Sequence, residues 1–162
     1  MEHSKKVGIA FGTTSAVITT LGLMVGLHSG THSKLAVLGG IITIAIADAF
    51  SDALGVHISE ESEGIHSKKE LWSSFTYTFL SKFLIAFTFI FPILYFSLET
   101  AMIINVFWGL ILLSILSFRI GGKNKKALEV VAEHLIIALI VVIFSHFLGD
   151  LIYFYFGVEN LA

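Results

Sequence analysis

The chain has 162 residues, of which 56% are apolar and only 14% are charged, and its formal net charge is −2 at pH 7. Soluble domains typically carry about 25% charged residues, so this composition excludes an ordinary water-soluble fold and indicates a protein surrounded by lipid. The slightly negative net charge argues against a nucleic-acid partner, which requires a basic surface. The absence of cysteine excludes disulfides, thiolate metal sites and cysteine nucleophiles.

Five segments are long and apolar enough to cross a bilayer as helices, since one crossing takes about 20 residues. They cover residues 7–27, 35–58, 71–98, 101–120 and 128–156, joined by short connectors at 28–34, 59–70, a tight turn at Glu99, and 121–127. Backbone groups in hydrocarbon must be satisfied within a segment, which favours helices. We therefore predict an all-α, polytopic membrane protein with a single transmembrane domain of residues 1–162.

The first two segments carry small side chains at four-residue spacing. In the first segment these are Gly8, Gly12 and Ala16, then Gly22, Gly26 and Gly30; in the second they are Gly39, Thr43, Ala47, Ser51, Gly55 and Ser59. Helices in lipid associate by close packing of such ridges, although glycine is also common in membrane helices generally. We expect these two segments to form a tightly packed inner pair.

The remaining three segments are bulky, and we expect them outside that pair. Their aromatic residues are Phe75, Phe79, Phe83, Phe87, Phe89 and Phe91 in the third segment, Trp108 in the fourth, and residues 153–156 in the fifth. The last group is typical of an aromatic belt at a membrane surface.

The distribution of lysine and arginine predicts the orientation. With the N-terminus in the cytoplasm, the inner segments hold Lys5, Lys6, Lys68, Lys69, Arg119, Lys123, Lys125 and Lys126, whereas the outer segments hold only Lys34. The positive-inside rule then places the N-terminus in the cytoplasm and the C-terminus outside. The first segment follows two lysines as a signal peptide would, but it is of full crossing length without a clear cleavage site, so we expect it to be retained.

Ionisable side chains inside the spans are candidate functional residues, because such groups usually face a bundle interior or a water-filled path. They are Asp48, Asp52, Lys82, Glu133, His134, His146 and Asp150. At about 1.5 Å per helical residue, Asp48 and Lys82 both lie near mid-membrane. They are expected to form an ion pair, either as a structural tie or as part of proton coupling with His134.

Asp52, Glu133, His134 and Ser15 are expected at a similar depth, nearer the inner surface. Asp48 and Asp52 are four residues apart and share one helix face. When all groups are ionised, the three carboxylates of Asp48, Asp52 and Glu133 together with the ammonium of Lys82 carry a net charge of −2. This net charge suits a divalent cation or protons. Carboxylates with an occasional imidazole accept Mn²⁺ or Fe²⁺, and such sites couple cation binding to proton release. Asp48, Asp52 and Glu133 are therefore the predicted metal ligands.

A second group of candidate metal ligands follows the second span. It comprises His57, Glu60, Glu61, Glu63 and His66. These residues either form an acidic collar that collects cations at the cytoplasmic mouth or simply solvate a helix end. At the outer surface, His28 and His32 are weaker candidates for metal binding. His146 and Asp150, four residues apart, either hydrogen-bond each other or mark an exit.

Two runs resemble the vacuolar iron transporter family. They are residues 11–26, FGTTSAVITTLGLMVG, and residues 47–62, ADAFSDALGVHISEES. With five spans and the same orientation, the resemblance covers essentially the whole chain. It implies export of Fe²⁺, often also Mn²⁺, from the cytoplasm in exchange for protons, by a homodimer with the first two spans around the path.

The chain departs from that family pattern at two positions. Ser15 stands where the family's first span commonly carries an aspartate, and Asp52 stands where the second span commonly carries a methionine. Relative to the family pattern, this chain therefore has the carboxylate on the second span instead of the first, at a similar depth. Only residues 59–70 connect the second and third spans, as in short prokaryotic members without a long cytoplasmic metal-binding region.

The leading hypothesis is a transporter of Fe²⁺ or Mn²⁺ in the cytoplasmic membrane, without enzymatic activity or a tightly bound cofactor. The alternative is a non-transporting assembly partner or metal sensor, which the lack of ionisable groups in residues 35–46 favours. A membrane-embedded hydrolase is a third class, but no HExxH or GxSxG motif occurs in the chain.

Overall fold

The computed structural model describes residues 2–122 and 125–157. In chain order the helices are α1 (Glu2–Thr31), α2 (Lys34–Glu63), α3 (Lys68–Thr88), α4 (Ile90–Tyr95), α5 (Leu98–Gly121) and α6 (Lys125–Phe156). The described residues contain no strand, which confirms the all-α prediction. Five crossings are long and apolar enough for a membrane, with α3 and α4 together forming the third. The predicted number of spans is therefore confirmed.

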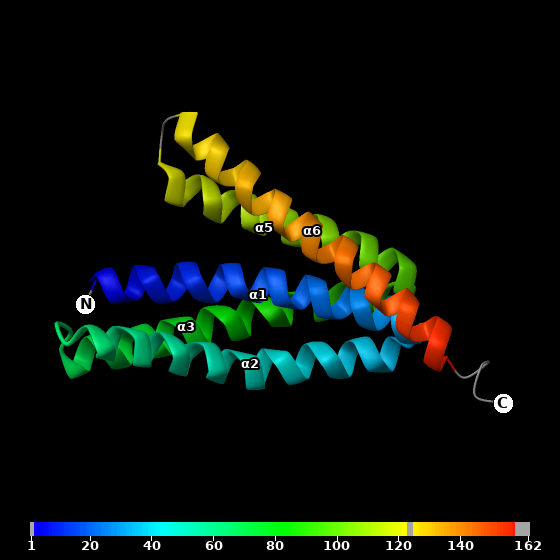
Figure 1. The fold of residues 1–162 in the computed structure, drawn as a ribbon, viewed down its shortest axis with the longest axis horizontal. Coiled ribbons are helices and arrows are strands. Elements are labelled where there is room, and N and C mark those ends of the chain that lie inside the picture. Colours follow the sequence, from blue (N-terminus) through cyan, green and yellow to red (C-terminus); the bar gives the residue numbers. More distant parts are fainter. Residues whose placement is uncertain (1, 123–124, 158–162) are drawn as a thin grey trace.

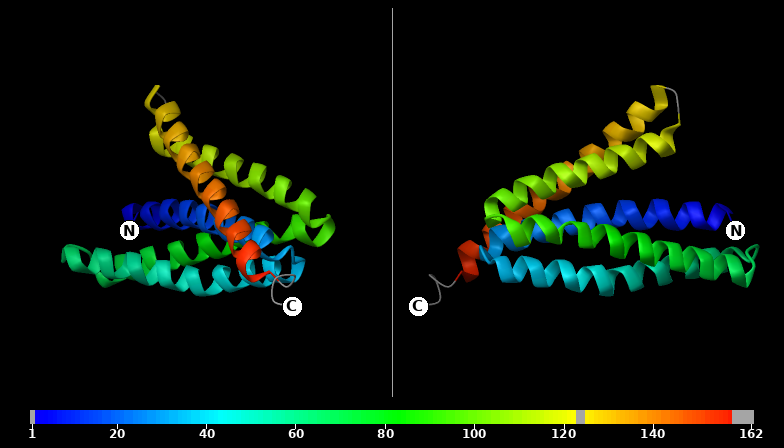
Figure 2. Two further views of the ribbon diagram at one scale, coloured as in Figure 1. Left: turned by 45° about the vertical axis from the view of Figure 1, so that its right-hand side comes forward. Right: turned by 180° about the vertical axis from the view of Figure 1, so that it is seen from behind.

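Helix α1 is the central helix of the bundle, because it contacts α2, α3, α5 and α6. Figure 1 shows α1, α2 and α3 running side by side, while the α5–α6 hairpin crosses them obliquely. The hairpin diverges from α1 toward the end that holds the N-terminus, as both views of Figure 2 also show. That end, where α1, α3 and α6 start and α2 and α5 end, is called the N-terminal end below.

Glycines on α1 allow two other helices to approach its backbone. A Cβ atom at Gly8 would meet the Ser74 carbonyl oxygen of α3 at 2.8 Å, and one at Gly12 would meet the Thr78 carbonyl oxygen at 2.5 Å. Near the opposite end, a Cβ at Gly149 of α6 would lie 2.6 Å from the carbonyl oxygen of Gly26. The small residues predicted on the first span are thus packing positions, as expected of close helix contacts in lipid.

The expected inner pair of α1 and α2 is only partly correct. The small ridge of α2, from Gly39 to Ser59, is exposed on the protomer, and a Cβ at Gly39 or Gly55 would meet no described atom within 4 Å. The buried face of α2 consists instead of Val37, Ile41, Ala45, Ala49 and Ala53. The two rows are offset by two residues, or about 200° around the helix, so burying one row exposes the other.

The expectation that the third span lies outside the inner pair is wrong, because α3 packs directly against both α1 and α2. Its buried residues include Ser74, Thr78, Lys82 and Ala86, at four-residue spacing. On another face, the rings of Phe79, Phe83 and Phe87 contact one another with centroid distances of 5.7 and 4.7 Å. The prediction relied on the aromatic residues of one face of this helix, whereas the small and polar residues of another face pack against α1 and α2.

The third crossing is interrupted, whereas the sequence predicted one continuous helix to residue 98. Pro92 lacks the N–H that would bond the carbonyl of Thr88, and its ring crowds that carbonyl, so α3 ends at Thr88. The side-chain amide of Asn105, fully buried on α5, donates to the Phe89 carbonyl at 2.9 Å. The chain then turns at residues 96–97, and Glu99 lies in the first turn of α5 rather than in the connector.

The connection between α2 and α3 is shorter than predicted, because α2 continues to Glu63. It ends at Gly64, whose φ of 68° is the left-handed conformation that glycine adopts readily. Ser67 and Glu70 then form a capping box that starts α3. The acidic residues that the sequence placed in a connector are therefore held on the last turns of a helix.

Apolar packing is concentrated away from the N-terminal end. The buried cluster includes Val17, Leu21 and Met24 of α1, Ile41 of α2, and Ile93 of α4. All five side chains are fully buried. The half of the bundle near the N-terminus holds buried polar groups that include Ser74, Thr78 and Lys82.

Candidate functional site

Lys82 is the centre of a polar cluster formed by α1, α2 and α3. Its side chain is 1% exposed, and its ammonium nitrogen lies 2.5 Å from Asp48 Oδ2. The same nitrogen pairs with Asp52 Oδ2 and donates to Ser15 Oγ at 2.8 Å. The structure therefore contains the Asp48–Lys82 ion pair that helix depth predicted, and it joins Asp52 and Ser15 to that pair.

The close packing of α1 and α3 explains how these residues meet. Gly12 allows α3 to approach α1, and Lys82 lies one turn after Thr78, on the face of α3 that contacts that glycine. Ser15 follows Gly12 by three residues on α1 and therefore lies on the same side of the helix. Helix α2 completes the cluster with two carboxylates on successive turns.

The charges of this cluster do not cancel. Two carboxylates face one ammonium, which leaves a net charge of −1 when all three groups are ionised. The Ser15 hydroxyl donates to Asp52 Oδ2 at 2.5 Å and so stabilises the negative charge. The side chains of Asp48 and Asp52 remain 32% and 20% exposed. The carboxylates are therefore accessible, although the ammonium between them is buried.

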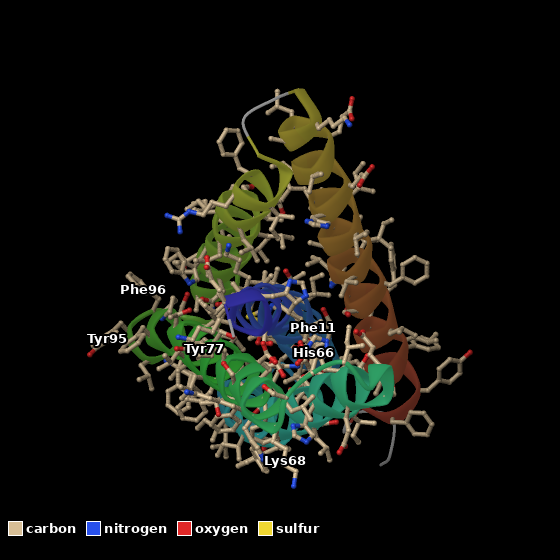
Figure 3. All side chains as sticks on the ribbon, turned by 90° about the vertical axis from the view of Figure 1, so that its left-hand side faces the viewer. Phe11, His66, Lys68, Tyr77, Tyr95 and Phe96 are labelled. Carbon is tan, nitrogen blue, oxygen red and sulfur yellow. The ribbon has the colours of Figure 1, made fainter. Side chains whose placement is uncertain are left out.

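A cavity of about 550 Å³ lies between α1 and α2 and extends from the N-terminal end to Asp52. Acidic and imidazole side chains among its lining residues are Asp52, Glu60, Glu63, His3 and His66. Figure 3 looks onto this end of the molecule and labels two residues that line the cavity, Phe11 of α1 and His66, which follows α2. The cavity is called the acidic vestibule below.

Glu60 is the most buried carboxylate in the part of the acidic vestibule near the N-terminal end. It is 6% exposed, and its Oε2 atom has no hydrogen-bond partner among the residues that the structure describes. A buried carboxylate oxygen without a partner is costly, so an occupant that supplies positive charge would stabilise it. Glu63 already contacts His66 at 3.2 Å, and the His66 ring stacks on His3.

Two predicted metal ligands, Glu133 and His57, and the predicted proton-coupling residue His134 lie elsewhere. Glu133 is exposed on α6, and the neighbouring His134 shares a hydrogen bond of 2.7 Å with Ser117 of α5. The His57 ring packs on Trp72 and approaches the Leu71 carbonyl at 3.2 Å. None of the three is among the residues that line the vestibule. The inner site thus combines Asp48 and Asp52 with Ser15 and Lys82, and Glu133 does not join it.

A separate polar cluster connects α1 and α6 at the opposite end. Ser29 Oγ lies 2.5 Å from His146 Nδ1, and His146 Nε2 lies 3.5 Å from Asp150 Oδ2. The rings of His28 and His32 are 5.9 Å apart. The expected contact between His146 and Asp150 is therefore present, with the serine as a closer partner.

Residues 2–122 and 125–157 contain no group of three or more histidine, aspartate or glutamate side chains placed to hold a metal ion. The inner site offers two carboxylates and one hydroxyl, with an ammonium among them. Comparison with protein-family models, with curated proteins and with solved structures finds no match to this chain. The functional conclusion therefore rests on the chemistry of the residues.

Both carboxylates and the lysine were predicted from the sequence, but two features of the site were not. The predicted ion pair joined Lys82 to Asp48 alone, and no contact between Lys82 and Ser15 was expected. A signal for the first was present, because Ser74, Thr78, Lys82 and Ala86 form a ridge of small and polar residues on the third span. Such a ridge predicts close packing, and it directs the lysine toward the bundle interior.

Proposed function

We propose that the chain is a transporter of divalent metal cations, Fe²⁺ or Mn²⁺, that moves them out of the cytoplasm in exchange for protons. The observation that carries this proposal is the acidic vestibule, which leads from the N-terminal end to Asp52, one of two partly exposed carboxylates whose charges Lys82 compensates only in part. A net negative charge at the end of such a path attracts cations and repels anions. Carboxylate and hydroxyl oxygens are suitable ligands for Mn²⁺ and Fe²⁺.

Export through this vestibule requires an orientation in which the N-terminal end faces the cytoplasm. Lysine and arginine residues support it, since Lys5, Lys6, Lys68 and Arg119 belong to helix ends on this side and Lys34 to the other. The vestibule then opens to the cytoplasm. The apolar cluster around Leu21 and Ile41 closes the other half of the bundle, as alternating access requires of an inward-facing state.

We further propose that the protein acts as a homodimer in the cytoplasmic membrane, with the α2 ridge at the interface. The ridge from Gly39 to Ser59 is exposed, and small residues at four-residue spacing permit close helix contact in lipid. The vestibule includes Ser51, Gly55 and Ser59 of the same ridge, so a second copy would adjoin the path. A particle mass in detergent of one chain, after correction for bound detergent, would contradict the dimer.

Transport is tested directly in proteoliposomes that contain the purified chain. We expect Mn²⁺ flux, and Fe²⁺ flux under anaerobic conditions, to depend on protein and to respond to an imposed pH gradient. Vesicles without protein are the control. Flux that does not exceed this control with either polarity of the gradient would contradict the proposal.

The second candidate function is a non-transporting assembly partner or metal sensor. It is favoured by the fact that Lys82 engages both carboxylates, as a structural ion pair would. Under this alternative, Mn²⁺ binds without flux, or does not bind. The proteoliposome experiment therefore separates the two functions.

Glu60 is expected to act at the entrance to the path rather than at the inner site. The substitution Glu60→Gln keeps the shape of the side chain and removes its charge. We expect a KM for Mn²⁺ that is about three- to tenfold higher with a similar maximal rate, because the vestibule attracts the cation less strongly. Glu61→Gln is the matched control, since Glu61 is exposed and is not a lining residue of the vestibule. Equal effects of the two substitutions would assign Glu60 no role in collecting cations.

A further inference from the structure

The ammonium group of Lys82 occupies the position in which the proposed cation would bind. It lies against Asp48 Oδ2, Asp52 Oδ2 and Ser15 Oγ, which are the oxygen atoms that the inner site offers as ligands. With 1% of its side chain exposed, Lys82 fills this space from within the protein. A metal ion and the ammonium cannot occupy the same position, so binding of one requires displacement of the other.

Lys82 has a side chain suited to such displacement. Its charge sits at the end of a flexible four-carbon chain, and the ammonium is a compact cation without a rigid binding geometry. Thr78 lies one turn earlier on the same buried face, and its hydroxyl has no hydrogen-bond partner among the described residues. This hydroxyl offers an acceptor for the displaced ammonium group.

We propose that Lys82 is a tethered competitor that makes the site selective for divalent over monovalent cations. Replacing the ammonium by a divalent ion brings the charge among the carboxylates from −1 to zero, whereas a monovalent ion leaves it at −1. Only the divalent ion gains electrostatic energy that offsets displacement of an attached group. A tethered group competes at a high effective concentration, so Na⁺ or K⁺ is excluded. This inference rests on the proposed function, since it concerns the same cation site.

The test compares Mn²⁺ binding by the full-length wild type, Lys82→Gln and Lys82→Arg in detergent, by titration calorimetry. We expect Lys82→Gln to bind Mn²⁺ more tightly by about tenfold or more, because the site no longer has to be vacated. Lys82→Arg keeps the competing charge and should not show this gain. Excess K⁺ should weaken Mn²⁺ binding to Lys82→Gln much more than to the wild type. Lys34→Gln, at an exposed lysine near the other end, is the matched control.

An affinity of Lys82→Gln equal to or below that of the wild type would overturn the inference. Because this variant leaves two carboxylates without a counter-charge, it is also purified with Mn²⁺ present throughout. Recovery of folded protein only with Mn²⁺ supports the inference, and failure to fold in both conditions overturns it, since Mn²⁺ then does not replace the ammonium. If the wild type transports Mn²⁺ but Lys82→Gln does not bind Mn²⁺ more tightly, only the proposed role of Lys82 is refuted. If Lys82→Gln binds Mn²⁺ more tightly but the wild type shows no flux, only the proposed transport is refuted.

Discussion

The substitution Asp52→Asn is expected to reduce Mn²⁺ flux into proteoliposomes by about tenfold or more. Asparagine keeps the size of the side chain, but the inner site is left with Asp48 and Lys82, whose charges cancel. A site without excess negative charge has no electrostatic preference for a divalent cation, so binding is lost before transport begins. Initial rates at several Mn²⁺ concentrations provide the measurement.

The control for this experiment is Asp150→Asn, at the opposite end of the bundle. Asp150 is 52% exposed and contacts His146 at 3.5 Å, so its removal changes a charge without touching the inner site. Circular dichroism of both variants establishes that the helices are intact. Equal flux for the wild type and Asp52→Asn would remove this carboxylate from the proposed transport mechanism.

The substitution Gly12→Ala is expected to lower the free energy of unfolding by about 1–3 kcal/mol, the usual cost of overpacking. A Cβ at this position would lie 2.5 Å from the Thr78 carbonyl oxygen, a backbone atom that cannot rotate away. Helices α1 and α3 must then separate, which also moves Ser15 away from Lys82. Thermal unfolding in detergent and Mn²⁺ affinity should therefore decrease together.

Gly55→Ala is the matched control for this substitution. An added Cβ at Gly55 meets no atom within 4 Å in the described part of the protomer, and Ala47 already occupies the same ridge two turns earlier. We expect Gly55→Ala to be at least as stable as the wild type, because alanine favours a helix over glycine and Ala47 already places a methyl group on this ridge, which is the proposed dimer interface. A Gly12→Ala protein as stable as Gly55→Ala would mean that α1 and α3 are not in backbone contact.

The number and approximate position of the crossings could be predicted from the sequence, because each depends on the composition of one continuous segment. The break near Pro92 shows the limit of composition alone. Phe89 and its neighbours are as apolar as the rest of the third segment, and the helix ends there because of one missing N–H and a buried amide from α5.

Asp48, Asp52 and Lys82 could be identified from the sequence as candidates, because charged side chains are rare in apolar segments and their depth follows from helix geometry. Their partners could not be assigned in the same way. Depth is a property of one helix, whereas the contact of Lys82 with Ser15 and Asp52 depends on the rotation of three helices about their axes. Glu133 has a similar predicted depth but lies exposed on α6.

The sequence by itself determined that this chain is helical, that its helices are suited to lipid, and that Asp48, Asp52 and Lys82 are among the charged groups within the apolar segments. Only the tertiary structure decided which ridge of α2 is buried and which counter-charge the carboxylates share. The physical reason is that α1 carries glycines where α3 carries Ser74 and Thr78, and this fit between two surfaces sets the helix rotations. Such complementarity belongs to a pair of helices, so no single segment contains it.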